Sequence, residues 1–230
     1  YLEKSPSYGI NGFYSASIKK FVEFLKEKPK DTSTNSVDII LKNLILSYKR
    51  RIKTHKLKNE KYKWQFIKEN KGKPDVSDLN FEDEIKSIKW NNLTYRLSGA
   101  VLNHLAQEKP NELKGLFKAL FDESELLYER IKVWDKDVLK LYRQINGEHS
   151  HHQDERAISV YLTLQHPNQY TFYKSSYYKK FCELLGIKPK KKGQKYIHYM
   201  ELINMLVNNH ISMDHELLDL VESFMPEYYD

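Results

Sequence analysis

The stretch SELLYERIKVWDKDVLKLYRQING, residues 124–147, decides the fold class. Its apolar residues recur every three or four positions, which places them on one face of a helix. Ser124 is a suitable N-cap and Gly147 a suitable stop. We therefore expect one long amphipathic helix here, with a buried stripe made of Leu127, Ile131, Trp134, Val138 and Leu141.

The same periodicity extends in both directions along the chain. It predicts an early helix with Ile18, Phe21, Val22 and Leu25 that ends near Pro29, and then a helix capped by Ser36 with Ile39, Ile40, Leu44 and Ile45 as its stripe. Further helices are expected at Trp64–Ile67, at Phe81–Ile88 with Asp78 or Asn80 as cap, at Leu93–Leu105 with Leu97 in the stripe, and at Leu113–Leu120 with Asn111 as cap. Four more are expected around residues 158–166, 177–185, 200–207 and 215–224. The chain is therefore predicted to be mainly α-helical and bundle-like, with at most a short strand pair near residues 158–173.

The composition argues against several classes of protein. The chain has 230 residues but only 8 Gly and 7 Pro, which is little for a turn-rich all-β fold. Cys182 is the only cysteine, so neither an internal disulfide nor a Cys-based zinc finger is expected, and a reducing, cytoplasmic compartment fits. No apolar run approaches membrane-spanning length, and no signal peptide is visible. The sequence begins with Tyr1 instead of Met, so we expect a fragment of a longer protein.

Charge is distributed unevenly. The net charge is +7, yet the residues after Lys195 hold seven acidic residues and no Lys or Arg, which leaves +14 on residues 1–195. The first basic cluster covers residues 48–58 and continues through Lys61 and Lys63, and we expect Lys49, Arg50, Arg51, Lys53 and Lys56 to bind phosphates. The second basic cluster covers residues 188–195, where Lys190, Lys191 and Lys192 lie in a predicted loop between Pro189 and Gly193. Solvated surface is the alternative interpretation of both clusters.

Aromatic residues precede the second basic cluster. Tyr170, Tyr173 and Tyr177 could stack on bases beside these cations. The alternative is that most of them pack in the core, as aromatic side chains usually do.

Other motifs are weaker. The chain lacks the G-x-x-x-x-G-K-[ST] and G-x-G-x-x-G phosphate loops and the G-x-S-x-G elbow. His151 has helical spacing to Asp154 and Glu155, but a third metal ligand is missing, so a polar helix start is the competing interpretation. Asp75, Glu84 and Lys86 imitate a nuclease motif that needs a strand, whereas Phe81, Ile85 and Ile88 have helical spacing. We therefore predict no metal, no cofactor and no catalytic residues.

Three segments, in the same order along the chain, resemble the region upstream of the motor in McrB-like AAA+ proteins. They are LFDES with LYERI (residues 120–131), QDERAISVYL (residues 153–162) and HPNQYTFYK (residues 166–174), and Tyr62-Lys63-Trp64 also fits. The sequence departs from the family tendency at His166, where Tyr is commoner. The resemblance covers roughly residues 60–185 by visual comparison. It suggests three parts: residues 1–58, a helical core at 59–186, and a basic loop with acidic helices at 187–230.

The resemblance implies a context for function. In such proteins a specificity or adaptor region precedes a GTP- or ATP-driven ring that works with a nuclease subunit against modified foreign DNA. We expect a non-enzymatic region that binds DNA, as duplex or flipped base, with or without modification. It would present this DNA to a motor through which the protein self-associates. The alternative is a protein-interaction module that docks a partner subunit or senses an invader protein, with Leu217, Leu218, Leu220, Val221 and Phe224 as its interface helix.

Overall fold

A computed structural model describes residues 36–54, 58–90, 93–146, 150–225. These residues form ten α-helices, a short 3-10 helix and one π-turn, and they contain no strand. The mainly helical prediction is confirmed, and the optional strand pair near residues 158–173 is not formed: residues 155–165 are helical, and residues 170–174 have no regular secondary structure. The predicted helix around Ile18–Leu25 lies outside the described residues.

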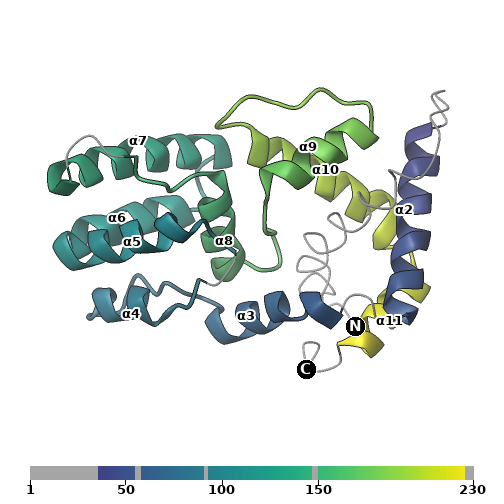
Figure 1. Cartoon of the computed structure of the whole chain (residues 1–230), viewed down its shortest axis with the longest axis horizontal. Helices are drawn as coiled ribbons and strands as arrows, with labels where there is room; N and C mark the ends of the chain where they lie inside the picture. The colour runs from purple at the N-terminus through teal and green to yellow at the C-terminus, as the bar shows by residue number, and fades with distance from the viewer. Residues whose placement is uncertain (1–35, 55–57, 91–92, 147–149, 226–230) are drawn as a thin grey trace.

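The helices follow one another with short connections. In chain order they are α2 (Ser36–Lys53), η2 (Lys58–Glu60), α3 (Tyr62–Asn70), α4 (Phe81–Ser87), α5 (Arg96–Glu108), α6 (Pro110–Phe121), α7 (Leu127–Asn146), α8 (Glu155–Gln165), α9 (Ser175–Leu184), α10 (Lys195–Leu206), η3 (Val207–Ile211) and α11 (His215–Phe224). Figure 1 shows α5, α6 and α7 stacked side by side at one end, α8 in the middle, and α2 with α11 at the other end.

The core is centred on Phe117. Its ring lies 4.8 Å from the ring of Trp134, 5.2 Å from that of Tyr161 and 5.9 Å from that of Phe81, measured between centroids. Because these residues come from α4, α6, α7 and α8, one aromatic cluster ties four helices together. The long stretch at residues 124–147 thus supplies a central wall of the core, with Ile131, Trp134 and Val138 buried as predicted.

Buried residues form one cluster that runs from Leu41 on α2 to Met225 after α11. The cluster includes side chains from all three parts that the sequence suggested, residues 1–58, 59–186 and 187–230. These parts share one core, and the division into three stays a prediction.

Several local predictions need correction. The first turn of α7 begins at Leu127, because Ser124 donates its hydroxyl to Asp122 Oδ1 at 2.6 Å and belongs to the preceding turn. Asn111 lies inside α6, whose first residue is Pro110, a residue suited to that position. Asn80 precedes α4 but makes no capping bond with its side chain. Ile39 and Leu97 are exposed, since each lies at the solvent edge of its apolar stripe.

Other helix ends follow the sequence. Asp154 caps α8 by accepting from the backbone N–H groups of Arg156 and Ala157. After α9, Gly186 takes a positive φ of +67°, and Ile187 N–H donates to the Cys182 carbonyl at 2.8 Å. Gly186 thus ends α9 in the left-handed conformation that glycine favours.

Candidate nucleic-acid interface

Two lysines of the first basic cluster are paired with acidic residues. The Lys49 ammonium lies 2.6 Å from Asp214 Oδ1 and 2.8 Å from Glu216 Oε2, and its side chain is 11% exposed. Lys53 Nζ lies 2.9 Å from Glu216 Oε1. Burial opposes the charge on Lys49, but hydrogen bonds to Asp214 and Glu216 outweigh it and raise the pKa of Lys49. The acidic helix α11 therefore neutralises the cations that we expected to contact phosphates.

The remaining members of the first basic cluster are less constrained. Arg50 is exposed and Arg51 is half-buried at the end of α2. Lys56 lies outside the described residues. The cluster therefore does not form a continuous row of exposed cations on α2.

Two of the three predicted aromatic contacts are buried. The Tyr170 hydroxyl accepts from Arg130 Nη2 at 2.6 Å and donates to Glu123 Oε1 at 2.9 Å. Tyr173 packs against the rings of Tyr196 and Tyr199 with centroids 5.7 and 5.5 Å away, and burial raises the pKa of Tyr173. Neither offers a ring face to a base in this structure, so the core interpretation holds for both.

Tyr177 differs from these two tyrosines. It is half-buried near the start of α9, and Lys174 Nζ lies 5.0 Å from its ring centroid. A base contact by Tyr177 stays a prediction.

The second basic cluster forms a loop between α9 and α10. Lys190, Lys191 and Lys192 are exposed. The backbone N–H of Lys190 donates to the Tyr178 hydroxyl at 2.7 Å, and that hydroxyl also lies 2.7 Å from His198 Nδ1. The loop is therefore attached to the core by its backbone while its side chains face solvent.

A basic stripe runs along the outer face of α7. It consists of Lys132, Lys136, Lys140 and Arg143, all exposed. Their spacing of four, four and three residues places them on one helix face, away from the face that buries Ile131 and Trp134. The sequence analysis did not predict this stripe, because its cations are three or four residues apart and do not form a contiguous run. The helical spacing was visible, and it was the signal that would have found these residues.

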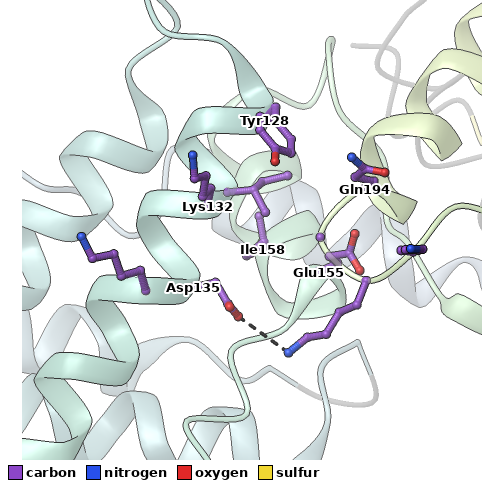
Figure 2. A pocket seen from close by; sticks show the side chains of 11 residues that line it. Tyr128, Lys132, Asp135, Glu155, Ile158 and Gln194 are labelled. Atoms are coloured by element: carbon purple, nitrogen blue, oxygen red, sulfur yellow. Dashed lines mark ion pairs between the residues drawn. The ribbon is translucent and has the colours of Figure 1, made fainter.

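The basic stripe and the second basic cluster meet at a cavity. Its volume is about 420 Å³, and Figure 2 shows it between α7, the loop and the first turn of α8. The cavity is lined by Tyr128, Ile131, Lys132, Asp135, Lys136, Glu155, Ile158, Lys191, Lys192, Gly193 and Gln194. Four lysines from two distant segments thus surround one opening, and Asp135 lies 4.0 Å from Lys192 Nζ.

Glu155 forms the inner acidic wall of this cavity. Its side chain is buried, and Oε1 accepts from the backbone N–H of Tyr196 at 3.0 Å in the first turn of α10. The carboxylate therefore compensates the positive end of the α10 dipole from a distant part of the chain.

His151 has other partners than a metal. Its Nδ1 accepts from the Gln153 backbone N–H at 3.0 Å, and its Nε2 lies 3.3 Å from Asp135 Oδ1. Burial lowers the pKa of His151. Because Nδ1 accepts a hydrogen bond, the ring proton lies on Nε2, which faces Asp135. In the described part of the chain, no group of three or more His, Cys, Asp or Glu side chains could hold a metal ion.

The nuclease-like motif lies on a helix. Glu84 belongs to α4, and its Oε1 accepts from the Asp75 backbone N–H at 3.0 Å while its Oε2 lies 3.3 Å from Lys73 Nζ. These contacts join a loop to a helix, so the adjacent strands that the nuclease arrangement requires are not formed.

Comparisons with protein-family models, with curated proteins and with solved structures found no match to this chain. Among the described helices, none is both long and apolar enough to cross a membrane.

Proposed function

We propose that this chain binds the phosphate backbone of DNA through the basic stripe on α7 and the second basic cluster. The observation that carries the proposal is the convergence of Lys132 and Lys136 with Lys191 and Lys192 around one opening. Lys and Arg side chains that neutralise phosphates release condensed counterions, which drives binding at low salt.

The stripe extends this surface beyond the cavity. Lys140 and Arg143 continue it along α7, and Lys190 continues it along the loop. Acidic side chains lie beside this surface: Asp135 is 4.0 Å from Lys192 Nζ and 3.3 Å from His151 Nε2, and Glu129 is 3.4 Å from Lys132 Nζ. A row of cations of this kind follows a phosphate backbone without selecting a base sequence.

The resemblance to McrB-like AAA+ proteins supplies the context of the proposal. In that context the chain is the non-enzymatic DNA-binding and specificity region of a cytoplasmic restriction protein. It presents DNA, modified or unmodified, to an NTPase motor that assembles with itself and with a nuclease subunit.

The protein-interaction alternative has lost its main support. It required the apolar face of α11 to be available to a partner. Leu217 and Val221 on that face are buried, and α11 packs along α2. Leu218, Leu220 and Phe224 are partly buried and also pack against the core. We therefore favour DNA as the partner.

Fluorescence anisotropy of labelled duplex and single-stranded DNA, with and without cytosine modification, tests the proposal at low and moderate salt. We expect affinity to fall steeply with salt. A preference for modified duplex would support a specificity role. Absence of binding even at low salt would overturn the DNA proposal.

A further inference from the structure

The cavity between α7 and the second basic cluster has two chemically different ends. Lys132, Lys136, Lys191 and Lys192 surround its opening, while Ile131, Ile158 and the buried Glu155 line its interior. In Figure 2 the Glu155 carboxylate lies beside Ile158, across the cavity from Lys132. A ligand that fits must carry negative charge at one end and an apolar, hydrogen-bond-donating group at the other.

We infer that this cavity binds a single nucleotide unit whose base carries an amino group, with the phosphate at the lysines and the base against Glu155. The volume of about 420 Å³ lies within the range of small-molecule sites. The unit comes either from a free nucleotide or from a DNA strand, because both offer the same chemistry.

The lysines fix where the phosphate lies. Lys192 is 73% exposed and reaches across the opening towards Asp135. Asp135 lies near Lys192, Glu129 lies 3.4 Å from Lys132 Nζ, and Glu155 lines the inner end, so three carboxylates accompany the four ammonium groups. The opening keeps a small positive excess, which attracts a phosphate. The inner end excludes the phosphate, because Glu155 already occupies the positive end of α10 and would repel a second anion.

The Glu155 carboxylate requires a base that donates a hydrogen bond. Its Oε1 already accepts one hydrogen bond from Tyr196 N–H, but a carboxylate accepts several. Adenine, cytosine and guanine present amino groups that can donate to it. Uracil has no amino group, and its single ring N–H lies between two carbonyl oxygens that the carboxylate repels. Ile131 and Ile158 line the same cavity and would supply apolar contacts to the ring.

The test compares four ligands by isothermal titration calorimetry: AMP, GMP, CMP and UMP. We expect at least one of the first three to bind about tenfold more tightly than UMP, the effect of one hydrogen bond to a charged group. Equal affinities for all four, or no binding at millimolar concentration, would overturn the inference without any variant.

Two variants test which part of the nucleotide binds at each end of the cavity. Glu155→Gln keeps an oxygen acceptor for Tyr196 N–H, and it should reduce the preference for amino-bearing bases towards the affinity for UMP. Lys191→Gln with Lys192→Gln should weaken all nucleotides about tenfold, since both side chains are exposed and the fold does not depend on them. A preference that survives Glu155→Gln would overturn the assignment of the base.

The inference shares its four lysines with the proposed DNA surface, and the two can fail separately. Lys140→Gln with Arg143→Gln alters the DNA surface outside the cavity and should leave mononucleotide binding unchanged. Salt-dependent DNA binding without any mononucleotide binding would overturn this inference alone. If a 5′-phosphorylated tetranucleotide displaces the bound mononucleotide, the ligand of the cavity is a nucleotide of a DNA strand. If it does not, the ligand is a free nucleotide.

Discussion

Lys49 on α2 and Asp214 at the start of α11 form an ion pair with 2.6 Å between Nζ and Oδ1. Asp214 also caps α11 by accepting from the Leu217 N–H at 3.1 Å. One carboxylate therefore connects two helices from opposite ends of the chain and starts one of them. Lys49 is a structural residue, although the sequence suggested a phosphate contact.

Lys49→Met should destabilise the fold more than it weakens DNA binding. It leaves Asp214 and Glu216 without their shared cation, and we expect a loss of about 1–2 kcal/mol in the free energy of unfolding, because the pair is only partly buried. Chemical denaturation measures this. Arg50→Met, at an exposed neighbouring position, is the matched control and should change stability by less than about 0.5 kcal/mol.

The contact between α2 and α11 should weaken in acid. Hydrogen bonds from Lys49 and Lys53 lower the pKa of Glu216 from its ordinary value of 4.5 to about 2. A carboxyl group whose pKa is lower in the folded state stabilises the fold fully above its unfolded pKa. That contribution is lost as the pH falls from about 4.5 to about 2.

Thermal unfolding between pH 7 and pH 2.5 checks this, with Glu216→Gln as the comparison. The variant should start with lower stability at pH 7 and lose less of it on acidification. Parallel curves for the two proteins would contradict the assignment.

DNA affinity should depend on the stripe along α7. Lys140→Gln with Arg143→Gln removes two exposed cations, and we expect about a tenfold weaker affinity at low salt and a salt slope smaller by about 2. Lys89→Gln, an exposed lysine after α4, is the control and should leave both values unchanged. If the control variant weakens binding as much as the stripe variant does, then the attraction is non-specific and the stripe is not the interface.

Charge reversal at Arg50 and Arg51 tests the first basic cluster in its own right. If this end of α2 contacts phosphate, the variant should weaken binding to all sequences alike. The same anisotropy titration, run with several duplex sequences, measures it. Unchanged affinity would restrict the interface to α7 and the second basic cluster.

Tyr161→Phe should cost about 1–3 kcal/mol of stability. The Tyr161 hydroxyl donates to Gln153 Oε1, and both side chains are fully buried. Gln153 Nε2 in turn donates to the Ser98 carbonyl at 2.7 Å, which connects α5 to the segment before α8. Without the hydroxyl, the Gln153 oxygen loses this donor inside the core.

Chemical denaturation at pH 7 measures the effect. Tyr128→Phe removes an exposed hydroxyl and is the matched control, with an expected change below about 0.5 kcal/mol. A small effect of Tyr161→Phe would mean that the Gln153 oxygen finds another donor.

The sequence by itself determined the helical class and most helix positions. Apolar spacing is a local property, so the buried stripes of α6 and α7 could be found from residues a few positions apart. Pro110 begins α6 and Gly186 follows α9, because proline and glycine restrict or extend the backbone locally. The caps at Asn111 and Ser124 were wrong, since several polar residues near each start could have served as the cap.

The tertiary structure determined which residues of the candidate site are exposed and which of them lie together. Lys49 and Glu216 are 167 residues apart, and only the packing of α11 on α2 brings this cation into a partly buried ion pair. From the sequence, Tyr170 and Tyr173 could lie at the surface or in the core. The contacts with Arg130 of α7 and Tyr196 of α10 show that they are buried. The loop lysines could be found from sequence, but their meeting with Lys132 and Lys136 could not. Periodicity fixes which face of a helix is buried, whereas long-range packing fixes which charges meet.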